Sequence, residues 1–286
     1  PAVSIGATVA KGRKADAAAT GEVTGKAAEA GTPQEAVAHG RALALSVSFD
    51  RSAYQTVTKR EQFEGWIAEA LDAGRVAFDT ETGDLDSVKA ELVGVSLATA
   101  PGRACYVPVG HRGGDGALDF GDGDGLEQMP IREAIDCLKP LLEDPSILKI
   151  GQNLKYDITV MGRYGIEIDG IDDTMLMSYT LDGGRGNHGL DDLAERHLRH
   201  TAISFKQVIA HAPGKKVSDK SFAEVPIDKA AEYAAEDADV TLRLWQILKP
   251  RLVAEQMMSV YQTLERPLVR VIADMERAGV KVDRNI

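Results

Sequence analysis

The sequence has few cysteines, few aromatic residues and no long apolar run, and each shortage excludes a class of protein. Of its 286 residues only two are cysteines, and aromatic residues make up 5%. Cys105 and Cys137 cannot build a disulfide framework or a cysteine-based zinc site, so they fit a reducing cytoplasm. No apolar stretch reaches the roughly 18 to 20 residues that cross a bilayer, and the N-terminus lacks a signal-peptide pattern. These features predict a cytoplasmic globular protein.

Positive charge is the next shortage. The chain carries 33 lysines and arginines against 44 acidic residues, which gives a formal net charge of −11. A protein that grips duplex nucleic acid through a broad surface is usually basic, so the charge argues against that mode of binding. A small site remains compatible with it, because bound cations can neutralise carboxylates and meet a phosphate.

Long apolar and aromatic side chains are scarce in residues 1–42, which are rich in alanine, glycine, threonine and lysine. Such a stretch buries too little surface to offset the entropy of ordering, so we predict a flexible linker there. A helix around residues 22–38 would be marginal on its own. Residues 43–250 are predicted to form the main domain, and residues 251–286 a helix that leads into a further, truncated domain.

Apolar spacing along the main domain alternates between strand-like and helix-like. Strands are predicted through Leu45, Val47 and Phe49 and over residues 76–79, 92–99, 104–109 and 148–152. Helices are predicted over residues 59–73, 131–142, 154–164, 173–181, 190–200, 228–248 and 252–277, with a new strand after Gly279. The turn at residues 100–102 can only join antiparallel neighbours. Three antiparallel strands followed by parallel strand–helix units predict an α/β protein with a mixed sheet flanked by helices.

The first functional motif ends an apolar strand. Asp79 and Glu81 stand two residues apart in Phe78-Asp79-Thr80-Glu81-Thr82, so a strand would place both carboxylates on one face. Such oxygen ligands suit a hard divalent cation such as Mg²⁺. When such a pair of carboxylates occurs without other signals, it more often belongs to a solvated turn.

Two further carboxylates fall near the ends of predicted elements. Asp157 lies in the first turn of a helix that directly follows a strand, the place where open sheets bind ligands. Asp237 follows Tyr233 by four residues on one alanine-lined helical face, where a phenol can orient a water nucleophile. Taken alone, Asp157 could complement the helix dipole and Asp237 could face solvent. Together the four carboxylates predict a cleft for two divalent ions, which suits in-line attack on a phosphodiester.

In their order, these motifs resemble one family. The matching segments are Phe78–Thr82, Gly151–Asp157 and Tyr233–Thr241, with further likeness at Asp173–Leu176 and Leu193–Arg196. They are similar to the 3′→5′ proofreading exonuclease domain of bacterial DNA polymerase I, a family A polymerase, from about residue 49 to the C-terminus. The resemblance implies an RNase H-like fold and metal-dependent hydrolysis at single-stranded or frayed DNA 3′ ends, in DNA replication and repair.

The resemblance also implies roles for individual residues. Asp79, Glu81 and Asp237 would hold one metal ion, and Asp79 with Asp157 the second; both would be Mg²⁺, with Mn²⁺ able to substitute. Tyr233, with Glu81, would orient the attacking water. The DNA strand would be bound by Leu85, Gln152, Asn153, Tyr156 and Phe205. Of these, Leu85 would wedge against the terminal bases and Phe205 would stack on a base.

One position departs from the family pattern. Where an arginine usually precedes the histidine aligned with His188, this chain has Asn187, with Arg185 close by. A phosphate contact is therefore expected to be lost or moved. In the whole protein a 5′ nuclease domain would precede residues 1–42 and a polymerase domain would follow. We expect a monomer in the bacterial cytoplasm, associated with the nucleoid.

Two other functions remain open from the sequence. Trimming of RNA 3′ ends, as in ribonuclease D, would use the same metal logic, and the 2′-hydroxyl that separates the substrates leaves no mark here. A non-catalytic scaffold that only binds DNA or braces a polymerase is the other alternative, and the complete set of four carboxylates argues against it.

Several motifs are set aside. The acidic loop at residues 119–125 lacks the spacing of a calcium loop, and the glycine-rich stretch 110–116 lacks the lysine of a phosphate-binding loop. The histidines at positions 188, 197, 200 and 211 lack zinc-ligand spacing and are expected at the surface or beside the site.

Overall fold

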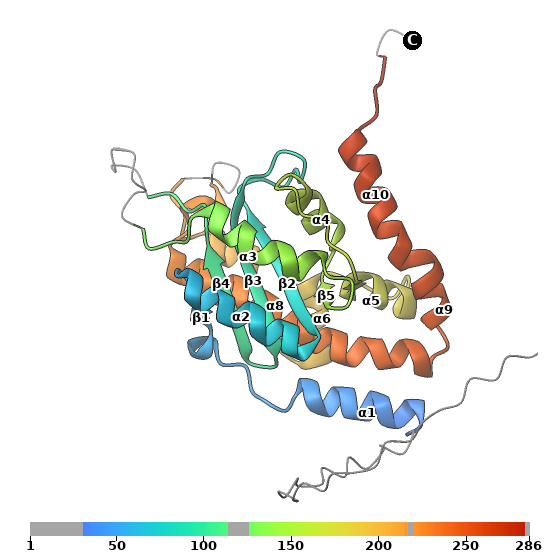
Figure 1. The fold of residues 1–286 in the computed structure, drawn as a ribbon. Coiled ribbons are helices and arrows are strands. Elements are labelled where there is room, and N and C mark those ends of the chain that lie inside the picture. The colour runs from blue at the N-terminus through green and yellow to red at the C-terminus, as the bar shows by residue number, and fades with distance from the viewer. Residues whose placement is uncertain (1–30, 114–125, 215, 217–219, 284–286) are drawn as a thin grey trace, which may run out of the picture. The chain divides into compact units, whose positions relative to one another are not determined.

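A six-stranded mixed sheet lies at the centre of the molecule, with helices on both faces (Figure 1). The computed structural model describes residues 31–113, 126–214, 216 and 220–283, and one compact unit begins at Thr32. The strands are β1 (Gln55–Thr56), β2 (Arg75–Thr82), β3 (Leu92–Ala100), β4 (Arg103–Pro108), β5 (Leu148–Gly151) and β6 (Ile171–Asp173). The helices are α1 (Pro33–Ala44), α2 (Arg60–Ala73), α3 (Ile131–Glu143), α4 (Lys155–Gly162), α5 (Thr174–Asp182), α6 (Leu190–Leu193), α7 (Phe205–Ile209), α8 (Ile227–Ala254), α9 (Met258–Val260) and α10 (Arg266–Ala278).

The strand order, β1-β4-β3-β2-β5-β6, confirms the predicted α/β architecture. β2, β3 and β4 pair antiparallel, joined in sequence by short connections. β5 and β6 then add parallel to β2, after the strand–helix units that the sequence predicts. β1 pairs parallel with β4 at the other edge. The sheet therefore places the C-terminal ends of β2 and β5 side by side, at the edge where ligands of open sheets bind.

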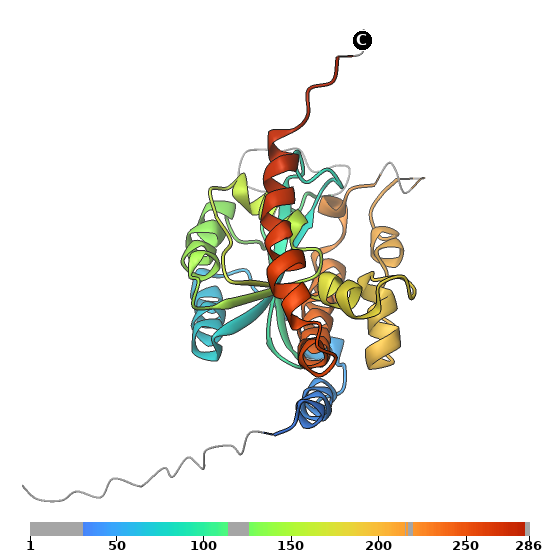
Figure 2. The ribbon, with the colours of Figure 1, turned by 90° about the vertical axis from the view of Figure 1, so that its right-hand side faces the viewer.

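Small side chains let α8 approach one face of the sheet closely. Ala77, Ala98 and Ala104 from the strands share a buried cluster with Ala235 and Ala238 of α8. The opposite face is covered by α2 and α3, which contribute large apolar side chains to the main core. At the β6 edge, α10 runs past α4 (Figure 2). No described helix is long and apolar enough to cross a membrane.

The predicted strand through Leu45, Val47 and Phe49 is wrong. The first of these caps the end of α1, and the next two lie in irregular chain. The carbonyls of Ala44 and Val47 instead accept hydrogen bonds from the buried Arg243 guanidinium, at 2.9 and 2.5 Å. A single arginine therefore satisfies backbone groups that a neighbouring strand would otherwise have to pair.

The predicted extent of the N-terminal linker is wrong for residues 33–42, which belong to α1. Thr32 begins this helix with a capping box, in which its hydroxyl and the Glu35 carboxylate bond each other's backbone amide. Packing of α1 along α8 supplies the burial that its own composition could not. Residues 1–30 of the predicted linker lie outside the described residues, as do residues 114–125, which include the acidic loop.

The predicted C-terminal helix over residues 252–277 is also interrupted. α8 continues to Ala254, the chain turns at Gln256 with a positive φ of 61°, and α9 and a π-helical turn lead into α10. Gly279 ends α10 with a φ of 70°, as its position predicts. The strand expected after it is absent from residues 280–283.

Gly40 of α1 lies directly against the backbone of α8. A Cβ atom there would lie 2.1 Å from the Gln246 carbonyl oxygen, whereas one at Gly65 of α2 would meet nothing within 4 Å. We expect Gly40→Ala to push α1 away from α8 and to lower the free energy of unfolding by about 1–3 kcal/mol, the usual cost of overpacking. Gly65→Ala is the matched control and should gain up to about 1 kcal/mol from helix propensity. Urea unfolding measures both, and equal stability of the two variants would contradict this packing.

Candidate active site

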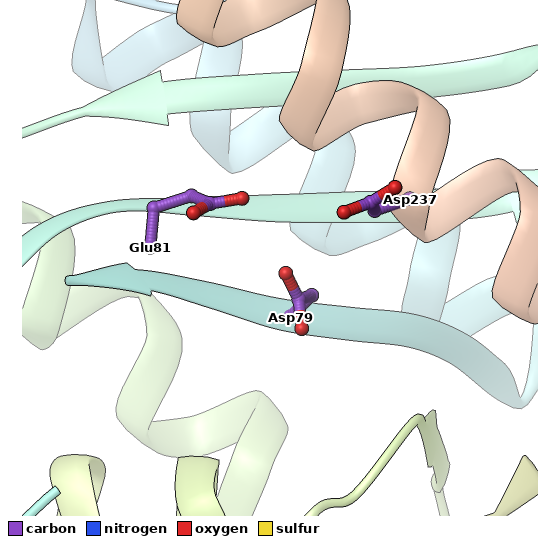
Figure 3. Close-up of side chains that lie close together, drawn as sticks. All are labelled: Asp79, Glu81 and Asp237. Atoms are coloured by element: carbon purple, nitrogen blue, oxygen red, sulfur yellow. The ribbon is translucent and has the colours of Figure 1, made fainter. Parts of the chain in front are cut away.

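Three carboxylates meet where α8 crosses the end of β2. Side-chain alternation along β2 places Asp79 and Glu81 on the same face as Ala77, which is the face covered by α8. Asp237 projects from α8 toward them, and carboxylate oxygens of the three residues all lie within 4.8 Å of one another (Figure 3). Among the described residues this is the one cluster with metal-ligand geometry.

Asp157 lies beside this cluster and is held by the strand itself. It stands in the first turn of α4, and its side chain is buried. Its Oδ1 accepts hydrogen bonds from the backbone nitrogen of Thr80 at 2.9 Å and from the Thr80 hydroxyl at 2.6 Å. Because Thr80 points to the opposite face from its two acidic neighbours, it joins α4 to β2 at the level of the cluster.

The turn from β5 into α4 explains how Asp157 reaches this place. Asn153 adopts a positive φ of 61°, a conformation that asparagine tolerates better than most residues. The buried Asp173 carboxylate then accepts hydrogen bonds from the backbone nitrogens of Asn153 and Leu154, at 3.3 and 2.8 Å. The strand therefore turns into the helix within a few residues, and the first turn of α4 opens onto the acidic cluster.

A cleft of about 580 Å³ surrounds the carboxylates. All ten residues singled out from the sequence line it, namely Asp79, Glu81, Leu85, Gln152, Asn153, Tyr156, Asp157, Phe205, Tyr233 and Asp237. Leu85 is 88% exposed and Phe205 44% exposed, although both are large apolar side chains. The cleft thus combines a buried acidic floor with apolar groups that remain open to solvent.

Several further cleft residues carry no signal in the sequence. The hydroxyls of Thr82 and Tyr156 lie 2.5 Å apart, and both reach the backbone oxygen of Asp84. One hydroxyl can donate to the other while the second donates to Asp84, which fixes the loop that bears Leu85. Phe222 packs against the Tyr233 ring, with centroids 5.9 Å apart. A buried phenylalanine or a strand-end threonine looks ordinary in sequence, and only the tertiary contacts show what each one supports.

Tyr233 lies against the acidic cluster with its hydroxyl protonated. Burial, together with the charges of Asp237, Glu81 and Asp79, raises the pKa of the Tyr233 phenol well above its usual value. The phenol therefore keeps its proton and can serve as a hydrogen-bond donor toward the neighbouring Asp237 carboxylate. Oδ1 of Asp237, by contrast, is buried without a hydrogen-bond partner in the described part of the chain.

Burial also raises the pKa of each carboxyl group in the cluster. It raises the pKa of Asp79 to about 7. The pKa values of Glu81, Asp157 and Asp237 are raised well above their ordinary range, first by burial and then by the charge of Asp79. Repelling carboxylates and an unpartnered buried oxygen are what a divalent cation would relieve, so these residues fit metal binding.

Without metal, the protein should become less stable as the pH rises. A carboxyl group with a raised pKa keeps its proton in the folded state at a pH where the unfolded chain has released it. The stability that protonated Asp79 contributes is therefore complete below the unfolded pKa near 3.8 and is lost as the pH passes about 7. Shifts of this size change stability by a few kcal/mol at most.

Mg²⁺ should restore that stability at pH 8 and add little at pH 5, where protons occupy the same oxygens. Thermal unfolding at the two pH values, with Mg²⁺ or with a chelator, measures the effect. The Asp79→Asn variant should show a flatter pH dependence without metal. Equal stabilisation by Mg²⁺ at both pH values would contradict this electrostatic picture.

The residues that line the cleft include neither Asn187 nor the histidines at positions 188, 197, 200 and 211. His188 bonds the Ser178 hydroxyl, and burial lowers the pKa of His197 to about 4. Asn187 donates to the Asp192 carboxylate at 2.6 Å, and its own carbonyl accepts from Arg196. Where the family pattern has arginine, this chain therefore has an amide that is engaged with a neighbouring side chain.

Comparison with known proteins agrees with this site. A family described as 3′-5′ exonuclease matches residues 54–253. DNA polymerase I of Rhizobium leguminosarum is 51% identical over 87% of this chain and 25% of its own length. DNA polymerase I of Pseudomonas aeruginosa is 40% identical over 82% of this chain and 24% of its own length. The chain thus spans about a quarter of the length of these relatives.

Solved structures support the same fold. The POL domain of Pol1 from M. smegmatis, in complex with DNA primer-template and dNTP, has a TM-score of 0.59 at 20% identity and covers 80% of this chain and 33% of its own. Escherichia coli RNase D, an exoribonuclease involved in structured RNA processing, has a TM-score of 0.55 at 17% identity over 79% of this chain and 51% of its own. These likenesses confirm the RNase H-like exonuclease fold. The family match and the two DNA polymerase I relatives show that the chain belongs to the 3′-5′ exonuclease domains of DNA polymerase I.

Proposed function

We propose that this exonuclease domain removes nucleotides from single-stranded or frayed DNA 3′ ends, in a reaction that requires two divalent cations. The observation that carries the proposal is the meeting of Asp79, Glu81 and Asp237 oxygens within 4.8 Å, inside a cleft flanked by exposed apolar side chains. A charged floor suits the phosphate of a substrate with its cations, and the apolar walls suit unpaired bases.

The four carboxylates divide between two cation positions. Asp79, Glu81 and Asp237 would hold one ion, and Asp79 with Asp157 would hold the second, with Mg²⁺ or Mn²⁺ as the metal. When bound, such a pair of ions supplies charge stabilisation for both the attacking and the leaving oxygen of an in-line displacement. The hydrogen bonds from Thr80 fix the orientation of Asp157, so its free oxygen can face the second position.

Uncharged groups in the cleft would orient the water and the strand. Tyr233 lines the cleft beside the carboxylates, and its protonated hydroxyl would orient a water molecule together with Glu81. Leu85 would wedge against the terminal bases and Phe205 would stack on one of them. Gln152, Asn153 and Tyr156, which also line the cleft, would contact the sugar–phosphate backbone.

The proposed substrate is DNA rather than RNA because the high-identity relatives are DNA polymerases, whereas the likeness to RNase D extends to the fold alone. The test uses 5′-labelled DNA and RNA strands of one sequence, digested with Mg²⁺ and resolved by length. We expect a ladder that shortens from the 3′ end and forms faster on DNA. A blunt duplex of the same DNA should resist. Faster digestion of RNA would favour the ribonuclease D-like alternative, and no digestion of either would favour a scaffold.

A polymerase domain is the proposed partner on the C-terminal side, and a 5′ nuclease domain on the N-terminal side, since the relatives are about four times as long. The outer face of α10 supports the first of these. Large apolar side chains stand exposed at helical spacing on α10 and on the π-helical turn before it: Leu264, Leu268, Val271, Ile272 and Met275. The monomeric state and the location at the bacterial nucleoid remain predictions.

A further inference from the structure

Glu236 stands next to Asp237 in sequence, is completely buried, and takes no part in the reaction described above. We propose that Glu236 is a positioning residue that holds the approach to α7, and with it Phe205, at the mouth of the cleft. The inference rests on the proposed function, because Phe205 has a task only if the cleft binds a strand.

The Glu236 carboxylate is fully used by hydrogen bonds that lead away from the metal-ligand cluster. Oε1 accepts from Arg51 Nε at 2.8 Å and from His200 Nε2 at 2.7 Å. Oε2 accepts from the backbone nitrogen of Ile203 at 2.8 Å and from Arg51 Nη2 at 3.2 Å. Successive residues on a helix point about 100° apart, so Glu236 and Asp237 serve different neighbours from one turn of α8.

These bonds end two residues before Phe205. Ile203 is tied to Glu236 through its backbone, and Ser204 then begins α7 with a capping box that includes Gln207. The later part of α7 is fixed differently, because Val208 and Ile209 are buried in the apolar cluster around Phe222. Packing therefore holds the C-terminal end of α7, while the Glu236 carboxylate holds the N-terminal end, where Phe205 projects.

His200, which bonds the Glu236 carboxylate, also packs against Phe49. The two rings stack with their centroids 3.6 Å apart and their planes within 11°. The Arg243 guanidinium lies 4.1 Å from the centroid of the same Phe49 ring, and it is paired with the buried Asp239 carboxylate. Residues 200–203 are thus attached to α8 by the buried Glu236 carboxylate and by the stack of His200 on Phe49. The buried Arg243–Asp239 ion pair supports Phe49 in turn, so the position of these residues is well defined.

Glu236→Gln tests the proposal with little change of volume. The amide removes the charge and turns one acceptor into a donor facing Arg51, His200 or the Ile203 amide, so the approach to α7 should relax. Stacking on one base is worth about 1–3 kcal/mol, so a misplaced Phe205 should raise KM for single-stranded DNA by about 5- to 150-fold. kcat should change by less than about threefold, since the carboxylate cluster and Tyr233 are untouched.

The discriminating experiment is a double-mutant cycle with Phe205→Ala. If Glu236 acts through Phe205, Glu236→Gln should raise KM in the wild-type background and have little further effect in Phe205→Ala. Asp172→Asn is the matched control. Its carboxylate is equally buried and paired with Lys249, but it lies on β6, away from the cleft. Its effects should add to those of Phe205→Ala. Additive effects of Glu236→Gln, or a loss in kcat alone, would overturn the proposal.

Two further measurements keep the outcomes distinct. Should Glu236→Gln fail to fold, His200→Asn removes a single donor and should give a smaller increase in KM that again vanishes in Phe205→Ala; additivity there would equally overturn the proposal. Fluorescence anisotropy of a labelled DNA strand, measured with a chelator present, repeats the cycle without cleavage. If the wild-type protein cleaves nothing, the proposed function fails, while the binding cycle still decides whether Glu236 acts through Phe205.

Discussion

Replacing Asp79 by alanine is expected to abolish cleavage while the fold remains intact. Asp79 is the residue shared by both proposed cation positions, so its loss removes a ligand from each. Charge stabilisation of this kind contributes several kcal/mol to the transition state, which corresponds to a rate loss of about 10³-fold or more. Because burial raises the pKa of Asp79 to about 7, removing this carboxyl group should leave the metal-free protein at pH 8 as stable as wild type or more so.

Single-turnover cleavage and urea unfolding of the same preparations test both halves of this expectation. Asp86→Ala is the matched control, since it removes an acidic side chain from the nearby loop. There Asp86 pairs with the exposed Lys89 and accepts a hydrogen bond from the Val88 backbone nitrogen. It should cleave at close to the wild-type rate. An Asp79→Ala protein that retains half of the wild-type turnover, or that unfolds, would show that the assignment of Asp79 is wrong.

Tyr233→Phe should give a clear but smaller loss of rate. The substitution keeps the ring and its contact with Phe222, and it removes only the hydroxyl beside the acidic cluster. Positioning of a reacting water by a side chain typically contributes about 10²- to 10⁴-fold. Because the task is shared with Glu81, we expect a loss of about 10²-fold or less, with affinity for the strand nearly unchanged.

Two quantities are measured for Tyr233→Phe: the single-turnover cleavage rate and the affinity for the DNA strand. If Tyr233 only packs, neither should change, and if it binds the strand, the affinity should fall. Tyr164→Phe is a suitable control, since it removes a hydroxyl that bonds the Leu92 backbone outside the cleft. Cleavage by Tyr233→Phe at the wild-type rate would reduce Tyr233 to a residue that fills space beside α8.

The acidic cluster could be anticipated because it depends on local periodicity. Residues two apart on a strand, or four apart on a helix, share a face. The sequence alone therefore predicts that Asp79 and Glu81 point the same way, and that Tyr233 and Asp237 do. Long apolar strands and the helix ending at Gly74 follow from the same local rules. That these distant segments meet in one cleft was predicted from the order and spacing of the motifs, which resemble those of the exonuclease family.

The remaining features depend on tertiary contacts that periodicity does not contain. Residues 45–49 alternate like a strand, yet no strand in the described part of the chain pairs with them. The buried Arg243 guanidinium instead bonds the carbonyls of Ala44 and Val47. β1 and β6 are two and three residues long, too short to show a pattern. From the sequence, Glu236 is indistinguishable from the other acidic residues of an amphipathic helix. Its role depends on the contacts with Arg51 and Ile203, which only the structure shows.

Metal depletion and add-back test the central claim most directly. The protein is treated with excess EDTA, dialysed, and given a 5′-labelled single-stranded DNA with no metal, with Mg²⁺ or with Mn²⁺. We predict no shortening of the strand without metal and recovery of stepwise 3′→5′ digestion when either ion is restored. The Asp79→Ala protein should stay inactive under all three conditions. Digestion that continues at the wild-type rate in excess EDTA would contradict a reaction that depends on cations held by Asp79, Glu81, Asp157 and Asp237.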